Sequence, residues 1–175
     1  MPALLAPLAI QPAIAAPQFR NAMRQLAGGI SVITAGRGDD IFGLTVTSVV
    51  SLSAEPPSLI FCLNRSSSTW PILNRYASFG VNVLSPEQQH VAERFSGRRG
   101  EKGAERYAGA DWISLATGTP LLSGAIAVLD CTVEETIDRP ASSIVIGRVV
   151  ALQVQCEAAT PYALAYWRGA YGVLR

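Results

Sequence analysis

The sequence predicts a mostly β domain in which antiparallel strands form a small closed barrel with a few peripheral helices. Three observations favour this fold class: β-branched runs alternate with turn residues along most of the 175 residues, the helical stretches are short, and there is no parallel strand–helix–strand rhythm. A chain of this length is expected to form one domain, which we assign to residues 18–175, after a flexible N-terminal tail over 1–17.

The first strands are expected to follow a short helix at residues 19–27. GGISVITA, residues 28–35, is a β-branched run typical of a strand, and GRGDD supplies turn residues after it. IFGLTVTSVVSLS, residues 41–53, alternates apolar and hydroxyl side chains, so these two runs are expected to pair as a hairpin.

The middle of the chain predicts two more strands and two helices. Prolines end the hairpin, and a buried strand is expected within residues 55–64, followed by a short helix near Trp70 and a strand at 79–84. SPEQQHVAERF, residues 85–95, is typical of a helix that is capped by Ser85 and has a proline in its first turn.

The second half contains the most polar stretch and the longest strands. RRGEKGAER, residues 98–106, is expected to be an exposed loop, either a solvated linker or a segment that covers a ligand. Long strands are predicted at 124–137 and 142–155, joined through DRPA.

Composition narrows the classes of function. Charged residues make up 15% of the chain and hydrophobic residues 49%, while the usual charged share is about 25%, so we expect surface that is hidden in an oligomer. The formal net charge of +1 gives no electrostatic basis for binding nucleic acid or an anionic membrane. Residues 1–16 are apolar but broken by prolines, which indicates neither a secretory signal nor a membrane span.

Cysteine, histidine and lysine are scarce. Cys62, Cys131 and Cys156 are odd in number and widely spaced, which fits neither a disulfide framework nor a zinc site and favours a reduced, cytoplasmic setting. The single histidine, His90, is expected on an exposed helix position, so we expect no metal site and no Ser-His-Asp centre. The single lysine, Lys102, lies in the polar loop, which disfavours an internal-aldimine enzyme.

LNRSSSTWP, residues 63–71, has the features of a phosphate cradle. If a helix begins near Trp70, Ser68 or Thr69 becomes its cap, and free N–H groups face the preceding loop. The serine hydroxyls and the planar cation of Arg65 add donors suited to an anion. A capped loop with an ordinary serine run gives the same pattern, so both interpretations stay open.

TVTSVVS, residues 45–51, places small hydroxyl side chains among valines. Such a wall offers backbone N–H groups beside an apolar face, on which a flat heteroaromatic ring could lie. A strand whose polar face is solvated is the alternative. Trp112 and Trp167 are expected in the core or at an interface, because aromatic side chains bury large areas.

These stretches, together with FGVNVL, QHVAERFSG, YAGADW and TPYALAYWRGAY, resemble the short-chain flavin reductases, the reductase partners of two-component flavin monooxygenases. The match runs from about residue 19 to about residue 174. The resemblance implies an FMN-binding split β-barrel, antiparallel and Greek-key-like, usually a homodimer. It also implies an NAD(P)H:flavin oxidoreductase that carries hydride from NADH or NADPH to FMN or FAD and passes reduced flavin to a flavin-dependent monooxygenase component.

The resemblance further implies, by position, which residues contact flavin and nicotinamide. The flavin contacts are Ile41, Phe42, Gly43, Leu44, Thr45, Thr47, Ser48, Val49, Val50 and Ser51, then Cys62, Leu63, Asn64, Arg65, Ser66, Ser67, Ser68 and Thr69, with Phe95 and Ser96 nearby. The nicotinamide contacts are Ser142 and the segment Thr160, Pro161, Tyr162 and Ala163. No catalytic side chain is expected, because the hydride passes between the two cofactors.

The chain departs from the family in one motif. Many members have Gly-Asp-His where this sequence has Pro140, Ala141 and Ser142, so the histidine near the nicotinamide is replaced by Ser142. Asp138 and Arg139 are close enough in sequence to supply a substitute polar contact. Two other functions stay open: a flavin-dependent reductase or oxidase of a corrinoid or pyridoxamine phosphate, and a flavin-binding protein without turnover.

Overall fold

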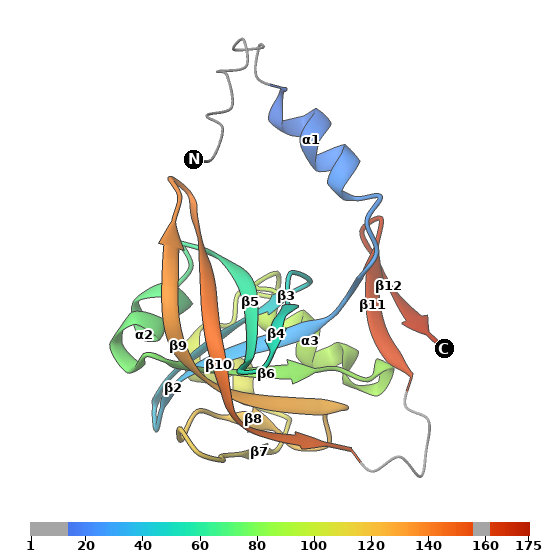
Figure 1. The fold of residues 1–175 in the computed structure, drawn as a ribbon. Helices are drawn as coiled ribbons and strands as arrows, with labels where there is room; N and C mark the ends of the chain where they lie inside the picture. The colour runs from blue at the N-terminus through green and yellow to red at the C-terminus, as the bar shows by residue number, and fades with distance from the viewer. Residues whose placement is uncertain (1–13, 156–161) are drawn as a thin grey trace, which may run out of the picture.

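A seven-stranded antiparallel sheet dominates the computed structural model, which describes residues 14–155 and 162–175 (Figure 1). Its strands lie in the order β3 (Asp40–Val46), β2 (Ser31–Arg37), β6 (Ser78–Val83), β9 (Ala127–Asp138), β10 (Ser142–Val154), β5 (Pro57–Asn64) and β4 (Val50–Ala54). A three-stranded sheet contains β1 (Gly28–Gly29), β11 (Ala163–Trp167) and β12 (Ala170–Leu174), and a two-stranded sheet contains β7 (Trp112–Ile113) and β8 (Leu121–Leu122).

The large sheet curls into a split barrel, whose open side lies between the edge strands β3 and β4. The mostly β, antiparallel prediction is confirmed, and the barrel is the split one that the family resemblance implied rather than the closed one expected from the strand pattern alone. The run expected as one strand over 41–53 is two strands, joined by residues 47–49, at opposite ends of the hydrogen-bonded order. Side-chain bonding contributes to this break, because the Ser48 hydroxyl accepts the Cys62 N–H of β5 at 3.2 Å.

The predicted hairpins are present. β2 pairs with β3, and β9 pairs with β10, both antiparallel. Gly36 makes the first hairpin possible, because its φ is +95° and an added Cβ would lie 1.9 Å from the Asp40 carbonyl oxygen. The β11–β12 hairpin was not among the predicted elements; Arg168 and Gly169, both with positive φ, form its turn.

The helices are shorter than predicted or begin elsewhere. α1 (Ala16–Met23) starts before the predicted residue 19, and α2 (Thr69–Tyr76) starts where the cradle motif placed it. The helix expected over 85–95 is a 3-10 turn, η1 (Pro86–Gln88), followed by α3 (Gln89–Phe95). Ser85 donates its backbone N–H to Gln88 Oε1 at 3.1 Å, as one half of a capping box.

Alternation along β2 divides the core into two clusters. Ile33 packs inside the barrel with Phe61, Leu63, Phe79 and other residues that are fully buried. Its neighbour Val32 faces the opposite side of the sheet and packs with residues of α3 and the following segment, among them Phe95 and Tyr107. α3 is therefore fixed on the outer face of the sheet, beside β3.

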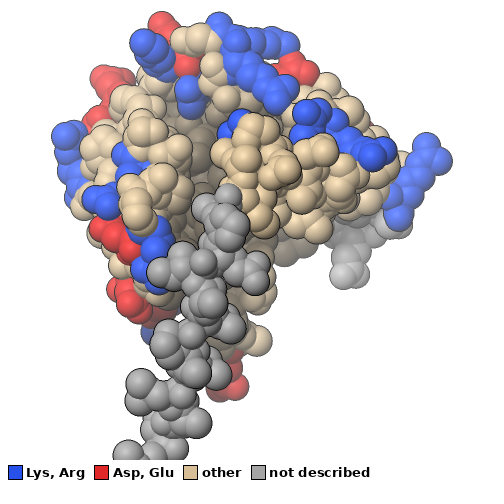
Figure 2. All heavy atoms as spheres, turned by 90° about the horizontal axis from the view of Figure 1, so that it is seen from above, with Lys and Arg blue, Asp and Glu red and all other residues tan. Residues whose placement is uncertain are grey.

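The described surface carries mixed charge. Figure 2, which views the molecule from above, shows basic and acidic side chains interspersed over this face, with neutral residues between them. Among the helices of residues 14–155 and 162–175, none is long and apolar enough to cross a membrane.

Candidate functional site

The wall predicted to hold a ring is fixed by α3 and by the segment after it. Thr45 Oγ1 donates to the Ala92 carbonyl oxygen at 2.6 Å, and Arg106 Nη1 donates to the Gly43 carbonyl oxygen at 2.7 Å. Gly43 has no room for a side chain, because an added Cβ would lie 2.5 Å from the Ile33 carbonyl oxygen. β3 is thus held in place by hydrogen bonds and by close packing.

The polar stretch 98–106 is partly structural. A second 3-10 turn, η2 (Gly103–Tyr107), ends in Tyr107, whose hydroxyl donates to the Phe42 carbonyl oxygen at 2.6 Å. Burial raises the pKa of the Tyr107 hydroxyl far above its ordinary value, so it stays a donor. Arg98 and Arg99 at the start of the stretch are exposed, and Arg98 reaches the cavity described next.

A cavity of about 240 Å³ opens beside this wall. It brings together three predicted flavin contacts, Thr45, Thr47 and Ser96, and the remaining lining residues are Val46, Arg98, Tyr166 and Tyr171. We call these seven residues the ring-end cavity.

Arg98 and Tyr166 were missed as site residues by the sequence reasoning. Arg98 Nη2 donates to the Tyr166 hydroxyl at 2.8 Å, and this hydrogen bond raises the pKa of the Arg98 guanidinium. Tyr166 also packs edge-on against Tyr171, with ring centroids 5.4 Å apart. The available signal was the recurrence of aromatic residues in YALAYWRGAY, residues 162–171. This segment was part of the family resemblance, but Tyr166 was not assigned a ligand contact.

A larger groove of about 480 Å³ continues from the ring-end cavity and shares Thr47 and Tyr166 with it. Its other walls are α1 and the β11–β12 turn, where Arg24 Nη2 donates to the Arg168 carbonyl oxygen at 3.0 Å. Figure 1 shows α1, which forms one of these walls, projecting away from the barrel.

The cradle segment has the predicted form, with a different capping hydroxyl. α2 begins at Thr69 with Ser68 at the N-cap, but Ser67 Oγ accepts the Thr69 N–H at 3.2 Å. Asn64 Oδ1 accepts both the backbone N–H and the hydroxyl of Ser66 at 2.9 Å. Ser68 is exposed and its side chain makes no capping hydrogen bond, so its hydroxyl is available to an anion. The Ser66 hydroxyl is also exposed, but it is already donated to Asn64.

Thr69 lies on the protein side of the cradle. Its side chain is fully buried, and Oγ1 finds no hydrogen-bond partner among the described residues. Leu63, another predicted contact, is also fully buried in the barrel core. Through their side chains these two residues support the cradle from within.

Arg65 is the single charged residue of the 62–69 segment, and its guanidinium lies over the Trp70 ring at 5.8 Å from the centroid. Its backbone N–H donates to the Ala141 carbonyl oxygen at 3.0 Å. In the β10–β5 register, Ser142 pairs with Asn64. The tip of the β9–β10 hairpin therefore lies directly against the cradle.

The remaining predicted contacts lie in several environments. Ile41, Phe42, Leu44, Ser48 and Val49 are half-buried, Val50 and Ser51 are exposed on the edge strand β4, and Cys62 is exposed on β5. Phe95 is buried in the core, 4.9 Å from the Tyr107 ring centroid. Trp112 packs in the same cluster, as predicted, whereas Trp167 is half exposed.

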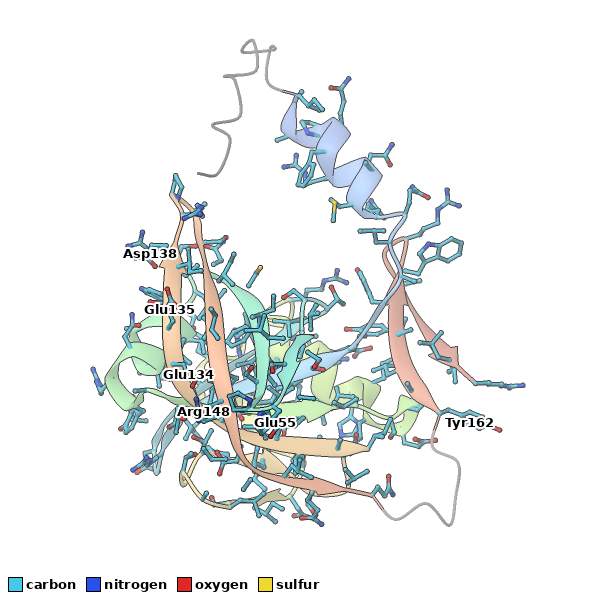
Figure 3. All side chains as sticks on the ribbon, in the orientation of Figure 1. Glu55, Glu134, Glu135, Asp138, Arg148 and Tyr162 are labelled. Carbon is cyan, nitrogen blue, oxygen red and sulfur yellow. The ribbon has the colours of Figure 1, made fainter. Side chains whose placement is uncertain are left out.

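The predicted nicotinamide contacts are not all brought together. Thr160 and Pro161 fall outside the described residues, and Ala163 begins β11. Figure 3 shows Tyr162 and Asp138 on opposite sides of the molecule, and Asp138 pairs with Ser143 in register, next to Ser142. Within one chain, Ser142 and Tyr162 therefore cannot contact the same small ring.

The described residues contain no group of three or more His, Cys, Asp or Glu side chains placed to hold a metal ion. His90 is exposed on α3, as predicted, and its Nδ1 lies 3.1 Å from the Glu87 carbonyl oxygen.

Residues 23–175 match the family described as the flavin reductase like domain. The chain belongs to this family. It is 39% identical over 140 residues to FMN reductase (NADH) RutF 2 of Methylorubrum extorquens, a match that covers 80% of each protein. It is 35% identical to the reductase subunit HsaB of a flavin-dependent monooxygenase of Mycobacterium tuberculosis, with 87% of this chain and 79% of HsaB covered.

A solved structure shows the same fold. BorF, the flavin reductase component of a bacterial two-component tryptophan halogenase, superposes with a TM-score of 0.81 at 30% identity, covering 91% of this chain and 98% of BorF. The predicted resemblance to flavin reductases and the split-barrel fold are both confirmed.

The residues of this chain fit a flavin. The ring-end cavity joins hydroxyl side chains to the rings of Tyr166 and Tyr171, and the cradle presents the exposed Ser68 hydroxyl and one guanidinium at a helix N-terminus.

Proposed function

We propose that this protein is an NAD(P)H:flavin oxidoreductase that supplies reduced FMN or FAD to a partner flavin-dependent monooxygenase. The observation that carries the proposal is the Ser48–Cys62 hydrogen bond of 3.2 Å, which joins the predicted ring wall to the predicted phosphate segment. Membership in the flavin reductase family, together with relatives named as an NADH-dependent FMN reductase and a monooxygenase reductase subunit, supports it.

In this proposal the ring-end cavity holds the isoalloxazine, and residues 64–69 hold the phosphate. A bound flavin supplies the redox chemistry by taking a hydride from the nicotinamide, so the chain needs neither a nucleophile nor a metal. Its own task is to hold the two rings in contact, and in this proposal Thr47, which lines the ring-end cavity, orients one of them.

NADH is the donor we propose first, because one relative is named as an NADH-dependent FMN reductase. The missing histidine has a structural counterpart: Ser142 lies beside Asn64, at the cradle rather than at the ring-end cavity. The structure thus favours a second candidate function, a flavin-binding protein that does not turn over.

We also propose a homodimer. β4 and β10 expose large apolar side chains, with Val50 at 55%, Leu152 at 58% and Val154 at 60% exposure, around a mostly apolar groove of about 360 Å³. Burying each such side chain stabilises an interface by about 1.5–3 kcal/mol. The apolar side chains of α1 are exposed as well, including Phe19 at 59%.

Leu152→Lys should convert the dimer to a monomer in analytical ultracentrifugation, whereas Glu135→Lys, on another exposed face, should not.

A reduced, cytoplasmic setting belongs to the same proposal. Cys62 and Cys131 are free thiols in the described part of the chain.

Anaerobic titration of the flavin-loaded protein with NADH and NADPH tests the proposal. An oxidoreductase bleaches the oxidised flavin band and, in air with excess flavin, consumes the nicotinamide steadily. Flavin binding without bleaching by either donor would instead establish a flavin-binding protein that does not turn over. Turnover with pyridoxamine phosphate or a corrinoid alone would establish a flavin-dependent oxidase or reductase of that substrate. Failure to bind any flavin would refute the proposal as a whole.

A further inference from the structure

Asp138 places a carboxylate beside the single cation of the cradle. Asp138 Oδ2 lies 3.7 Å from Arg65 Nη2, and both side chains are about half exposed. Figure 3 shows Asp138 near the tip of the β9–β10 hairpin, at the end of β9. The carboxylate thus lies where a phosphate bound by Arg65 would come close to it.

This carboxylate is fixed independently of Arg65. Ser143 Oγ donates to Asp138 Oδ1 at 2.7 Å, and Ser143 itself is buried. Asp138 also pairs with Ser143 in the β9–β10 register. This hydrogen bond favours the orientation in which the carboxylate lies beside the cradle.

The neighbouring cation Arg139 faces the backbone of Asp138 and forms no ion pair with its carboxylate among the described residues. Its Nη1 donates to the Asp138 carbonyl oxygen at 2.8 Å, and its side chain lies at the exposed hairpin tip. The Arg65 guanidinium lies over the Trp70 ring. The candidate phosphate site therefore combines the side chain of Arg65 with the carboxylate of Asp138.

A site of this kind distinguishes phosphates by charge. The terminal monoester of FMN carries between about 1.5 and 2 negative charges at neutral pH, whereas each phosphate of the FAD pyrophosphate carries about one. Repulsion by a fixed carboxylate grows in proportion to the charge of the phosphate that it faces. The second charge of FAD lies on a phosphate one P–O–P linkage farther along, so Asp138 opposes the FMN monoester more strongly than it opposes FAD.

We propose that Asp138 is a specificity-determining residue of the flavin site, which disfavours the phosphate monoester of FMN and biases the protein toward FAD. The proposal rests on the proposed function, because it requires that flavin phosphates bind at Arg65. It assigns Asp138 a role in ligand choice, and no role in the redox step.

Dissociation constants for riboflavin, FMN and FAD, measured by flavin fluorescence at low ionic strength, test the proposal. Asp138→Asn keeps an oxygen that can accept the Ser143 hydroxyl and removes the charge. It should tighten FMN binding by roughly fourfold, FAD binding by a smaller factor, and riboflavin binding not at all. Added salt should shrink both gains, since exposed charges are screened.

Glu135→Gln is the matched control. Glu135 is exposed on the same strand, three residues away, so it lies on the opposite face of β9 and its loss makes the same change in net charge. It should leave all three dissociation constants unchanged. In a chain that carries Arg65→Gln, FMN and FAD should both bind more weakly than to the wild type, with riboflavin unaffected.

The outcomes separate the two proposals. If Asp138→Asn leaves both phosphorylated flavins unchanged, or changes them by the same factor, Asp138 does not select between them, and the proposed function stands without it. If the wild-type protein binds none of the three flavins, the proposed function itself fails.

Discussion

The hydroxyl of Ser48 accepts the backbone N–H of Cys62 at 3.2 Å and so ties the connection between the barrel edges to the C-terminal part of β5. Ser48 lies two residues after the end of β3, while Cys62 comes just before the cradle. The two predicted flavin segments are therefore linked as one unit.

Replacing Ser48 with alanine should loosen that unit. The Cys62 amide is exposed on β5 and can bond water instead, so the free energy of unfolding should fall by only about 0.5–1.5 kcal/mol. Flavin affinity should fall more than this, because wall and cradle are no longer aligned. Denaturant unfolding and fluorescence titration measure the two effects on one sample.

Ser53→Ala provides the comparison for Ser48→Ala. Its hydroxyl bonds the Glu55 backbone in the β4–β5 turn, away from both predicted segments. Similar flavin affinities for the two variants would show that the Ser48 bond does not align the site.

Neighbouring hydroxyls of the cradle should behave in opposite ways. Ser68 is exposed at the N-cap of α2, so Ser68→Ala should weaken FMN and FAD binding about tenfold or more, as expected for a lost hydrogen bond to a charged group. Thr69 Oγ1 is buried and finds no partner in the described chain, so Thr69→Val should raise the free energy of unfolding by about 1 kcal/mol and leave flavin affinity unchanged. Weaker flavin binding by Thr69→Val would instead support the prediction that this hydroxyl contacts the flavin.

The sequence was most informative where a local pattern and its structural cause coincide. The β2–β3 turn could be predicted because GRGDD places glycine at Gly36, where only a residue without Cβ fits. Pro71 and the serine run placed the start of α2 within one residue, because helix termini have strong local preferences.

Pairing between residues far apart in the chain was harder to predict from the sequence. Residues 41–53 read as one strand, since nothing local shows that a side chain of Ser48 would take the amide of a residue fourteen positions later. Arg98 and Tyr166 meet across 68 positions, and neither segment alone predicts the other. The order of the seven strands likewise follows from packing of the whole sheet rather than from any one segment.

Tyr166→Phe should affect the ring end of the site and leave the cradle intact. The change removes the hydroxyl that accepts Arg98 Nη2 and keeps the ring that packs on Tyr171. We therefore expect riboflavin, FMN and FAD to bind more weakly by a similar factor of about two to ten, the loss of roughly one hydrogen bond. Arg65→Gln supplies the contrast, because it should affect only the phosphorylated flavins; a Tyr166→Phe effect confined to FMN and FAD would place Tyr166 at the tail instead.

Cys62 should report on ligand binding through its chemical reactivity. Its side chain is exposed and lies between Ser48 and the cradle, whereas Cys131 is fully buried. Iodoacetamide should modify Cys62 and leave Cys131 unmodified in the folded protein, and saturating FMN or FAD should slow the reaction at Cys62. Peptide mapping assigns each label to its cysteine. Equal rates at Cys62 with and without flavin would move the ligand away from this strand.

Cys131 should make the folded protein less stable at high pH. It lies in the barrel cluster, where burial, with a smaller contribution from the neighbouring Asp130, raises the pKa of its thiol to about 12. The ordinary value is 9.0, so between pH 9 and 12 the unfolded chain loses this proton while the folded chain keeps it. The stabilisation is complete below about pH 9 and disappears as the pH rises through that window, at about 1 kcal/mol per pH unit.

Urea unfolding at pH 8, 9 and 10 under reducing conditions should therefore show a steeper fall in the free energy of unfolding for the wild type than for Cys131→Ala. The variant is less stable at every pH because it contains a cavity, so the slope and not the absolute value decides the outcome. Parallel slopes would mean that the Cys131 thiolate is tolerated in the barrel.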